Sequence, residues 1–156
     1  MTQAPGRQLI LDLPHRAALG AEDFLVSQSN AAATAMVDRW PQWPASALLL
    51  LGPPGSGKSH LVEVWRQRSQ AQRIEARGLR SVTVPGLFAH RALALEDAGP
   101  GLDETALFHL LNLAHQRDAH VLITSSLNPA QWNVTLPDLL SRLRAAPSME
   151  IGAPDA

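Results

Sequence analysis

The stretch Ala47–Ser59, "ALLLLGPPGSGKS", decides the fold of this chain of 156 residues. Its first five residues are an unbroken apolar run, which is typical of a short strand buried on both faces. The other eight match G-x-x-x-x-G-K-[ST] at every fixed position, and a helix from Lys58 to about Gln70 is predicted to follow. A strand, a glycine-rich loop and a helix in this order predict a phosphate-binding loop; the alternative is an ordinary Gly/Pro turn.

Each part of this loop has a chemical reason. Gly55 and Gly57 permit the positive φ angles at which consecutive backbone N–H groups face phosphate oxygens, and the helix N-terminus adds its positive dipole end. The Lys58 ammonium is expected on the β- and γ-phosphates, and the Ser59 hydroxyl is expected to ligate Mg²⁺. The candidate nucleotide-binding residues of the loop are Gly52, Pro53, Pro54, Gly55, Ser56, Gly57, Lys58, Ser59 and His60.

A second apolar run, "ALAL" at 92–95, ends in Glu96 and Asp97. A phosphate-binding loop needs a carboxylate on a neighbouring strand to hold the water shell of Mg²⁺, and Glu96 is the candidate. Asp97 is expected to orient or deprotonate an attacking water. Two solvated acids at a strand end are the alternative. A third run ends in "TSS", where Ser126 is a candidate contact for the γ-phosphate.

The order of elements predicts an α/β fold. Buried strands are expected at 47–51, 92–95 and 120–124, and helices at about 30–40 and within 103–118, where apolar residues recur at helical spacing. A last strand is expected near "MEI" at 149–151. Strands that alternate with helices form parallel sheets, so a parallel central sheet is predicted.

Composition limits the class of protein. Apolar residues make up 46% and charged residues 17%, which is a globular composition. A net charge of −1 argues against a domain that grips DNA phosphates, so little direct DNA binding is expected. The absence of cysteine excludes disulfides and thiolate metal sites, and no run reaches the roughly 18 apolar residues of a membrane span. We therefore expect a cytoplasmic protein.

The assembled motifs resemble the DnaA/Hda family of AAA+ proteins, over nearly the whole chain, and in particular its Hda-type regulators. The segments that carry the resemblance are "FLVSQSNAAA" (24–33), "GKSHL" (57–61), "LFHLLN" (107–112), "LITSSLNP" (122–129) and "LPDLLSRL" (136–143). The last of these looks like the family's arginine-finger segment.

The resemblance implies a three-layer P-loop NTPase fold, the AAA+ base domain, that binds ADP or ATP with Mg²⁺. It implies that Val26 and Asn30 frame the adenine and that Arg142 is offered to a nucleotide on a neighbouring subunit. A solvated surface arginine is the alternative for Arg142. The chain departs from the family pattern at Glu96, where an aspartate is usual, and at Ser126. The helical lid domain is expected to be missing from these residues.

The segment "QLILDL" at 8–13 gains a meaning from the resemblance. Hda-type proteins bind the replicative sliding clamp, the β subunit of DNA polymerase III, through a peptide of this pattern. Gln8, Leu9, Leu11 and Leu13 are therefore the candidate clamp-binding residues, with a core strand as the alternative. The expected organisation is an N-terminal arm at 1–20 and a nucleotide-binding domain at 21–156.

Two functions follow from the resemblance. In the first, the chain is a clamp-tethered adaptor that presents Arg142 to DnaA, promotes hydrolysis of ATP bound there and so represses a second initiation. Its own ATPase activity would be weak or absent. In the second, it is a self-contained DnaA-type ATPase, and a homo-oligomer is left open. A small phosphotransferase is disfavoured because no basic lid or acceptor signature follows the loop.

Overall fold

A computed structural model describes residues 30–152 of the chain. The predicted arm at 1–20, with Gln8, Leu9, Leu11 and Leu13, lies outside the described residues, and so does Val26. In order along the chain, the elements are α2 (Ala31–Asp38), β1 (Ala47–Leu51), α3 (Lys58–Ser69), β2 (Gln72–Glu75), η1 (Ala76–Gly78), η2 (Ser81–Gly86), β3 (Ala92–Glu96), α4 (Glu104–Gln116), β4 (His120–Ser125), η3 (Pro129–Gln131), α5 (Pro137–Ala145) and β5 (Ser148–Glu150).

The strands form one parallel sheet in the order β2-β3-β4-β1-β5. Every residue of β1 and β3 is buried, as expected for strands that are covered on both faces. The strand that carries the glycine-rich loop, β1, therefore lies inside the sheet, and the acidic strand β3 lies two places from it. The predicted parallel α/β fold is confirmed.

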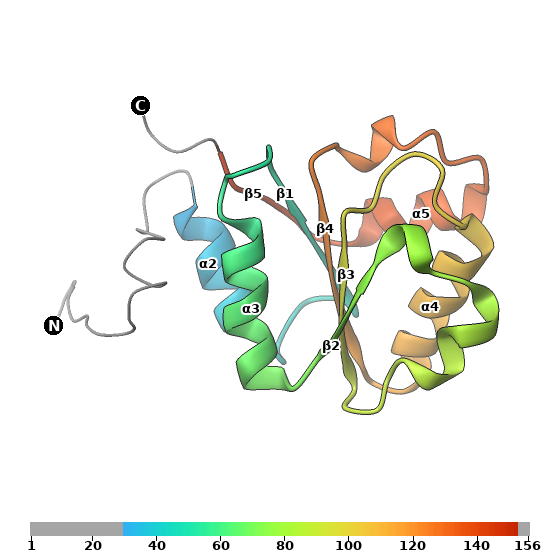
Figure 1. The fold of residues 1–156 in the computed structure, drawn as a ribbon, viewed down its shortest axis with the longest axis horizontal. Helices are drawn as coiled ribbons and strands as arrows, with labels where there is room; N and C mark the ends of the chain where they lie inside the picture. Colours follow the sequence, from blue (N-terminus) through green and yellow to red (C-terminus); the bar gives the residue numbers. More distant parts are fainter. Residues whose placement is uncertain (1–29, 153–156) are drawn as a thin grey trace, which may run out of the picture.

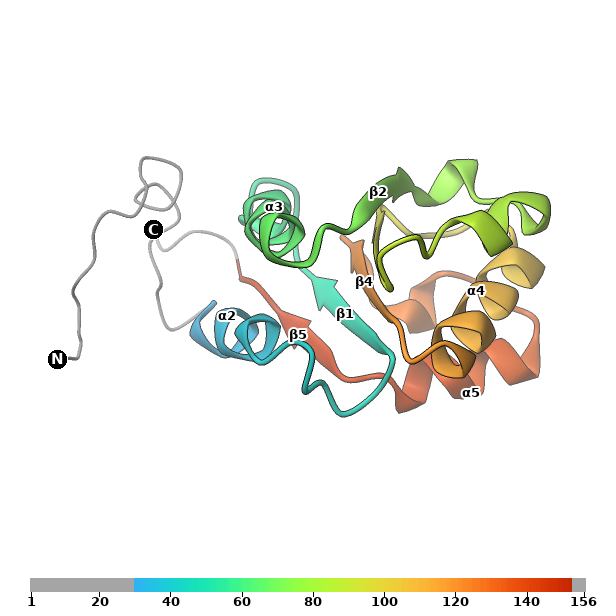
Figure 2. The same ribbon diagram turned by 90° about the horizontal axis from the view of Figure 1, so that it is seen from below.

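Helices cover both faces of this sheet, so the molecule has three layers (Figures 1 and 2). Helices α2 and α3 pack on one face, against Leu48, Leu50, Ala94 and Leu122. Helices α4 and α5 and the turn η2 pack on the other face, against the residues that alternate with these along the strands. Alternation of side chains along a strand thus assigns each core residue to one layer.

The ends of the elements place the candidate site. Because all strands are parallel, the carboxyl ends of β1, β3 and β4 meet at one edge of the sheet, and α3 begins there directly after the glycine-rich loop. In open α/β sheets, ligands bind outside this edge. No helix within residues 30–152 is long and apolar enough to cross a membrane.

Candidate nucleotide site

The glycine-rich loop, the acidic strand and the third strand enclose one cavity of about 480 Å³. We call this cavity the P-loop pocket. Its lining residues are Pro54, Gly55, Gly57, Lys58, Ser59, His60, Glu96, Asp97, Thr124 and Ser126. All but one of these were candidate site residues, so the structure brings together three segments that the sequence could only treat separately.

The start of α3 is shaped to receive an anion. Gly57 is its N-cap residue with φ 105°, a left-handed conformation that side chains rarely adopt. No side chain caps this helix end, and no acidic residue lies in its first turn. The backbone N–H groups of that turn and the positive end of the helix dipole are therefore available to a bound phosphate.

Gly52 is required by close approach rather than by its φ angle. A Cβ atom at this position would lie 2.3 Å from the carbonyl oxygen of Ile151 and 2.9 Å from the Ser56 hydroxyl. The Gly52 N–H also donates to the carbonyl of Ser125, at 3.1 Å. These contacts fix the point at which the loop leaves β1, at the end of β4 and beside the residue that follows β5.

Lys58 lies folded over its own loop. Its ammonium donates to the carbonyl oxygens of Gly52 and Pro53, the latter at 3.0 Å. Burial lowers the pKa of Lys58, and the negative charges of Asp97 and Glu96 partly oppose that shift. A phosphate in the pocket would replace two neutral carbonyl acceptors with charged oxygens, which form stronger hydrogen bonds to an ammonium.

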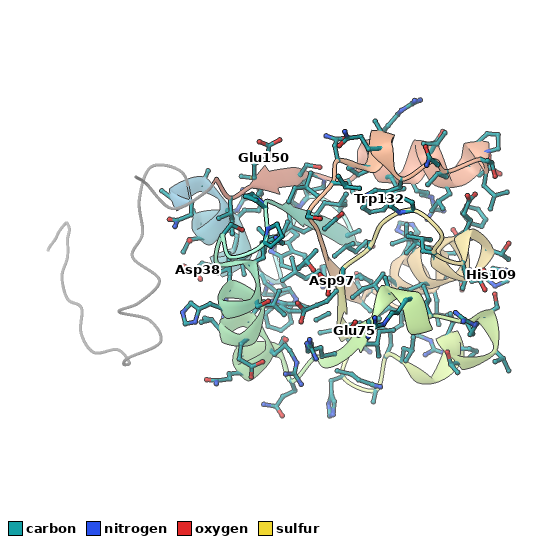
Figure 3. All side chains as sticks on the ribbon, turned by 45° about the horizontal axis from the view of Figure 1, so that its top comes forward. Asp38, Glu75, Asp97, His109, Trp132 and Glu150 are labelled. Carbon is teal, nitrogen blue, oxygen red and sulfur yellow. The ribbon has the colours of Figure 1, made fainter. Side chains whose placement is uncertain are left out.

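The two carboxylates after β3 have different surroundings. Glu96 is the last residue of the strand and is only 4% exposed, whereas Asp97 is exposed. Asp97 has φ 62°, and its backbone N–H donates to the Thr124 hydroxyl at 3.0 Å. In the view of Figure 3, Asp97 projects between α3 and α4. A residue held in a left-handed conformation at a strand end is a frequent feature of functional sites.

Thr124 is the pocket residue that was not among the candidates. Its hydroxyl accepts from the N–H of Asp97 and its carbonyl accepts from the N–H of Ala98, at 2.9 Å, so it orients the turn after β3. The neighbouring Ser125 points to the other face, where it is buried and donates to the carbonyl of Ala98 at 2.6 Å. The "TSS" at the end of β4 was the available signal. The sequence does not show which of these hydroxyl side chains points to the pocket, because that depends on which face of β4 is turned toward the loop.

Four candidate nucleotide-binding residues in the described part of the chain do not line the pocket. Gly52, Pro53 and Ser56 belong to the loop behind it, and Asn30 occupies the N-cap position of α2. The Ser56 hydroxyl is buried and has no hydrogen-bond partner among residues 30–152. Their proposed roles toward a nucleotide remain predictions.

Solved structures share this fold. The chain resembles AMPPCP-bound DnaA from Aquifex aeolicus, with a TM-score of 0.69 and 19% identity over 83% of this chain and 49% of that one. It also resembles domain III of the Thermotoga maritima replication initiation protein DnaA, with a TM-score of 0.68 and 21% identity over 86% and 67% of the two chains. The fold is that of an AAA+ domain.

A third similar structure is the FIGL-1 AAA domain in complex with ADP, with a TM-score of 0.63 and 18% identity over 88% of this chain and 57% of that one. The chain spans about half the length of the AMPPCP-bound DnaA structures that it matches, at 49% and 48%. No protein-family model and no curated protein matches the sequence. At these identities, the comparisons establish the AAA+ fold, and the function is argued from the site.

The candidate finger Arg142 lies on α5, which packs on the opposite face of the sheet from α3. Leu139 and Leu143 are the buried residues of α5. The guanidinium carbon of Arg142 lies 5.7 Å from the centroid of the Phe108 ring. Within residues 30–152, Arg142 is not among those that line the P-loop pocket. Its guanidinium therefore lies outside the candidate nucleotide site of its own chain.

The start of α5 is tied to α4 by one carboxylate. Glu104 accepts from the backbone N–H groups of Thr135 and Leu136, at 3.0 and 2.9 Å. These bonds lower the pKa of Glu104 below its ordinary value of 4.5, and the bond from Leu136 has the largest effect. The contact fixes the loop that precedes the α5 helix, and with it the position of Arg142.

Replacement of Glu104 by glutamine is expected to destabilise the fold by no more than about 1 kcal/mol at neutral pH, since the carboxylate is partly exposed. A lowered carboxyl pKa stabilises the fold above the unfolded pKa, and this contribution disappears as the pH falls through the folded pKa. Urea unfolding of both proteins should therefore differ at about pH 7 and converge at about pH 3. A difference that is equal at both pH values would contradict this role.

Proposed function

We propose that the chain binds an adenine nucleotide in the P-loop pocket. The observation that carries the proposal is the convergence of the α3 N-terminus, Lys58 and the acidic end of β3 on one cavity. The similar structures with AMPPCP or ADP support the same ligand class. The phosphates would contact the loop N–H groups and Lys58, and we retain Asn30 and Val26 as proposed contacts for the adenine.

The residues of the pocket also fit Mg²⁺. Within residues 30–152, no group of three His, Cys, Asp or Glu side chains could hold a metal without other ligands. Mg²⁺ in nucleotide sites is held by one or two protein oxygens together with phosphates and waters. Ser59 and Glu96 are the pocket residues that we propose for this role, Glu96 only as far as its ion pair with Arg73 allows. The ion would neutralise phosphate charge.

The biological role that we propose is regulation of replication initiation, as in Hda-type proteins. The chain would approach ATP-bound DnaA and present Arg142 to the nucleotide of DnaA, while Gln8, Leu9, Leu11 and Leu13 hold the sliding clamp. The position of Arg142 outside its own P-loop pocket supports a role toward another subunit. Its own nucleotide would then stabilise the interface.

Hydrolysis of ATP by DnaA, measured with clamp loaded on DNA, tests this role. We expect the chain to accelerate it, and we expect Gln8→Ala with Leu9→Ala to abolish the acceleration and the binding to the clamp. Exchange of the exposed Val82 for alanine is the matched control and should leave both unchanged. If hydrolysis of ATP by DnaA stays at its basal rate when the full chain is added, the adaptor role is wrong.

A self-contained DnaA-type ATPase is the second candidate. The observation in its favour is that Glu96 and Asp97 line the same pocket as Lys58, so the carboxylates for hydrolysis are in place. Steady ATP turnover by the purified chain without DnaA would favour this candidate. The adaptor role instead predicts turnover that is negligible beside the DnaA reaction.

A further inference from the structure

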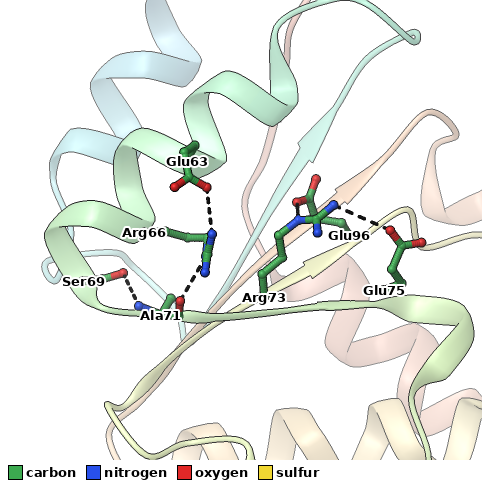
Figure 4. A network of polar contacts seen from close by, with 7 residues as sticks. All are labelled: Glu63, Arg66, Ser69, Ala71, Arg73, Glu75 and Glu96. Atoms are coloured by element: carbon green, nitrogen blue, oxygen red, sulfur yellow. Dashed lines mark hydrogen bonds and ion pairs between the residues drawn. The ribbon is translucent and has the colours of Figure 1, made fainter. Parts of the chain in front are cut away.

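The buried carboxylate of the P-loop pocket already has a cationic partner. Arg73, on the edge strand β2, donates through its Nε to a carboxylate oxygen of Glu96 (Figure 4). The Glu96 side chain is 6% exposed and the Arg73 side chain 45% exposed. A carboxylate buried to this degree is stable as an anion only when it is paired, and the guanidinium of Arg73 is the partner.

The register of the sheet makes this pair. β2 and β3 are parallel, with Arg73 opposite Ala94 and Glu75 opposite Glu96. Side chains at alternate positions share a face, so Arg73, Glu75 and Glu96 all project on one side of the sheet. The Nη2 of Arg73 also lies 3.6 Å from a carboxylate oxygen of Glu75, as Figure 4 shows. The guanidinium is thus held between a half-buried carboxylate and a buried one.

Arg73 itself is not one of the residues that line the P-loop pocket in the described part of the chain. Its guanidinium reaches Glu96 from the edge strand β2, which pairs with the acidic strand β3. Hydrogen bonding to Glu96 raises the pKa of the Arg73 guanidinium, which stays charged under all ordinary conditions. The consequence is a permanent positive charge beside the one buried carboxylate of the described chain that could face a metal ion.

We propose that Arg73 is a resident counter-ion of Glu96, and that it makes nucleotide binding by this chain nearly independent of Mg²⁺. The proposal rests on the proposed nucleotide site. A divalent cation next to Glu96 must either displace the guanidinium or share the carboxylate with it, and both options reduce the gain from the metal. Arg73 is then a positioning residue, acting on the ligand through Glu96.

Isothermal titration with ADP, in EDTA and in millimolar Mg²⁺, tests this directly on the full chain. The ratio of the two dissociation constants is the readout. For the unmodified chain, we expect this ratio to stay within about threefold. In Arg73→Gln, the freed Glu96 carboxylate can serve the metal, so Mg²⁺ should strengthen ADP binding by about tenfold or more. Arg73→Lys keeps a cation and should stay near the unmodified value.

Arg77→Gln is the matched control. Arg77 is 87% exposed and lies 3.5 Å from the other carboxylate oxygen of Glu75, so its loss removes an arginine from the same segment without touching Glu96. Its ratio should equal that of the unmodified chain. If Arg73→Gln does not fold, Glu96→Gln provides the second test: under the proposal it leaves the Mg²⁺ ratio unchanged, whereas a carboxylate that serves the metal would make the ratio fall.

The outcomes separate the two proposals. A strong Mg²⁺ dependence in the unmodified chain, or equal ratios in it and in Arg73→Gln, overturns the counter-ion proposal and leaves the nucleotide site standing. An absence of ADP binding in every protein, with and without Mg²⁺, overturns the nucleotide site itself.

Discussion

Replacement of Lys58 by alanine is expected to weaken ADP binding by at least about 100-fold. Lys58 is the only lysine in the sequence and the only lysine or arginine that lines the P-loop pocket in the described chain. A hydrogen bond to a charged group contributes about 1.5–3 kcal/mol, and each 1.4 kcal/mol is tenfold in affinity, so loss of two such bonds from the ammonium to oxygens of the β-phosphate accounts for the effect. Titration calorimetry with ADP measures it.

The fold should survive this change. Lys58 is not in the core, and within residues 30–152 its side chain donates to two carbonyl oxygens of its own loop. Arg66→Ala is the control, since Arg66 is a cation on the same helix that pairs with Glu63 at 2.8 Å. It should bind ADP as the unmodified chain does. Equal affinities in Lys58→Ala and Arg66→Ala would show that the ammonium does not contact the ligand.

Replacement of Arg142 by alanine is expected to lower the stimulated rate of hydrolysis of DnaA-bound ATP by about 10³-fold. If the basal rate of DnaA alone is higher than that, the rate should fall to the basal rate. The guanidinium of an arginine finger stabilises charge on the transferring phosphoryl group, and alanine removes it. The contact with Phe108 is partly exposed and contributes on the order of 0.5–2 kcal/mol, so the domain should still fold and bind the clamp.

Arg144 is the matched control for Arg142. It lies two residues further along α5, in the same last turn, and is exposed. Arg144→Ala should retain full acceleration in the same single-turnover measurement of DnaA-bound ATP. Equal losses in both variants would assign the effect to the net charge of α5 and would reject Arg142 as the finger.

Most of the fold could be predicted from the sequence because its strands are buried on both faces. β1, β3 and β4 each give an unbroken apolar run, and α4 gives a clear apolar stripe. β2 could not be predicted, because it is an edge strand of sequence "QRIE" in which no residue is fully buried. Its pairing with β3 is a property of the sheet and not of its four residues.

The candidate site also has parts that the sequence predicts and parts that it does not. The loop could be predicted because its residues match a phosphate-binding motif at every fixed position, and the acidic strand because a buried run ends in two carboxylates. The structure brings Lys58, Glu96 and Asp97 to one cavity. Arg73 gave no signal, since its role depends on the register of β2 against β3. Thr124 was visible only as one of three hydroxyl residues at a strand end.

The central claim is that the P-loop pocket holds the phosphates of a nucleotide, and acylation of the single lysine tests it most directly. Burial lowers the pKa of Lys58, so its amine should react at lower pH than an ordinary lysine does. Peptide mapping by mass spectrometry then gives its labelling rate with and without millimolar ADP, with the N-terminal amine as internal reference. We expect ADP to slow labelling of Lys58 by about tenfold or more and to leave the N-terminal amine unchanged. Equal labelling of Lys58 in the presence and absence of ADP would contradict the account.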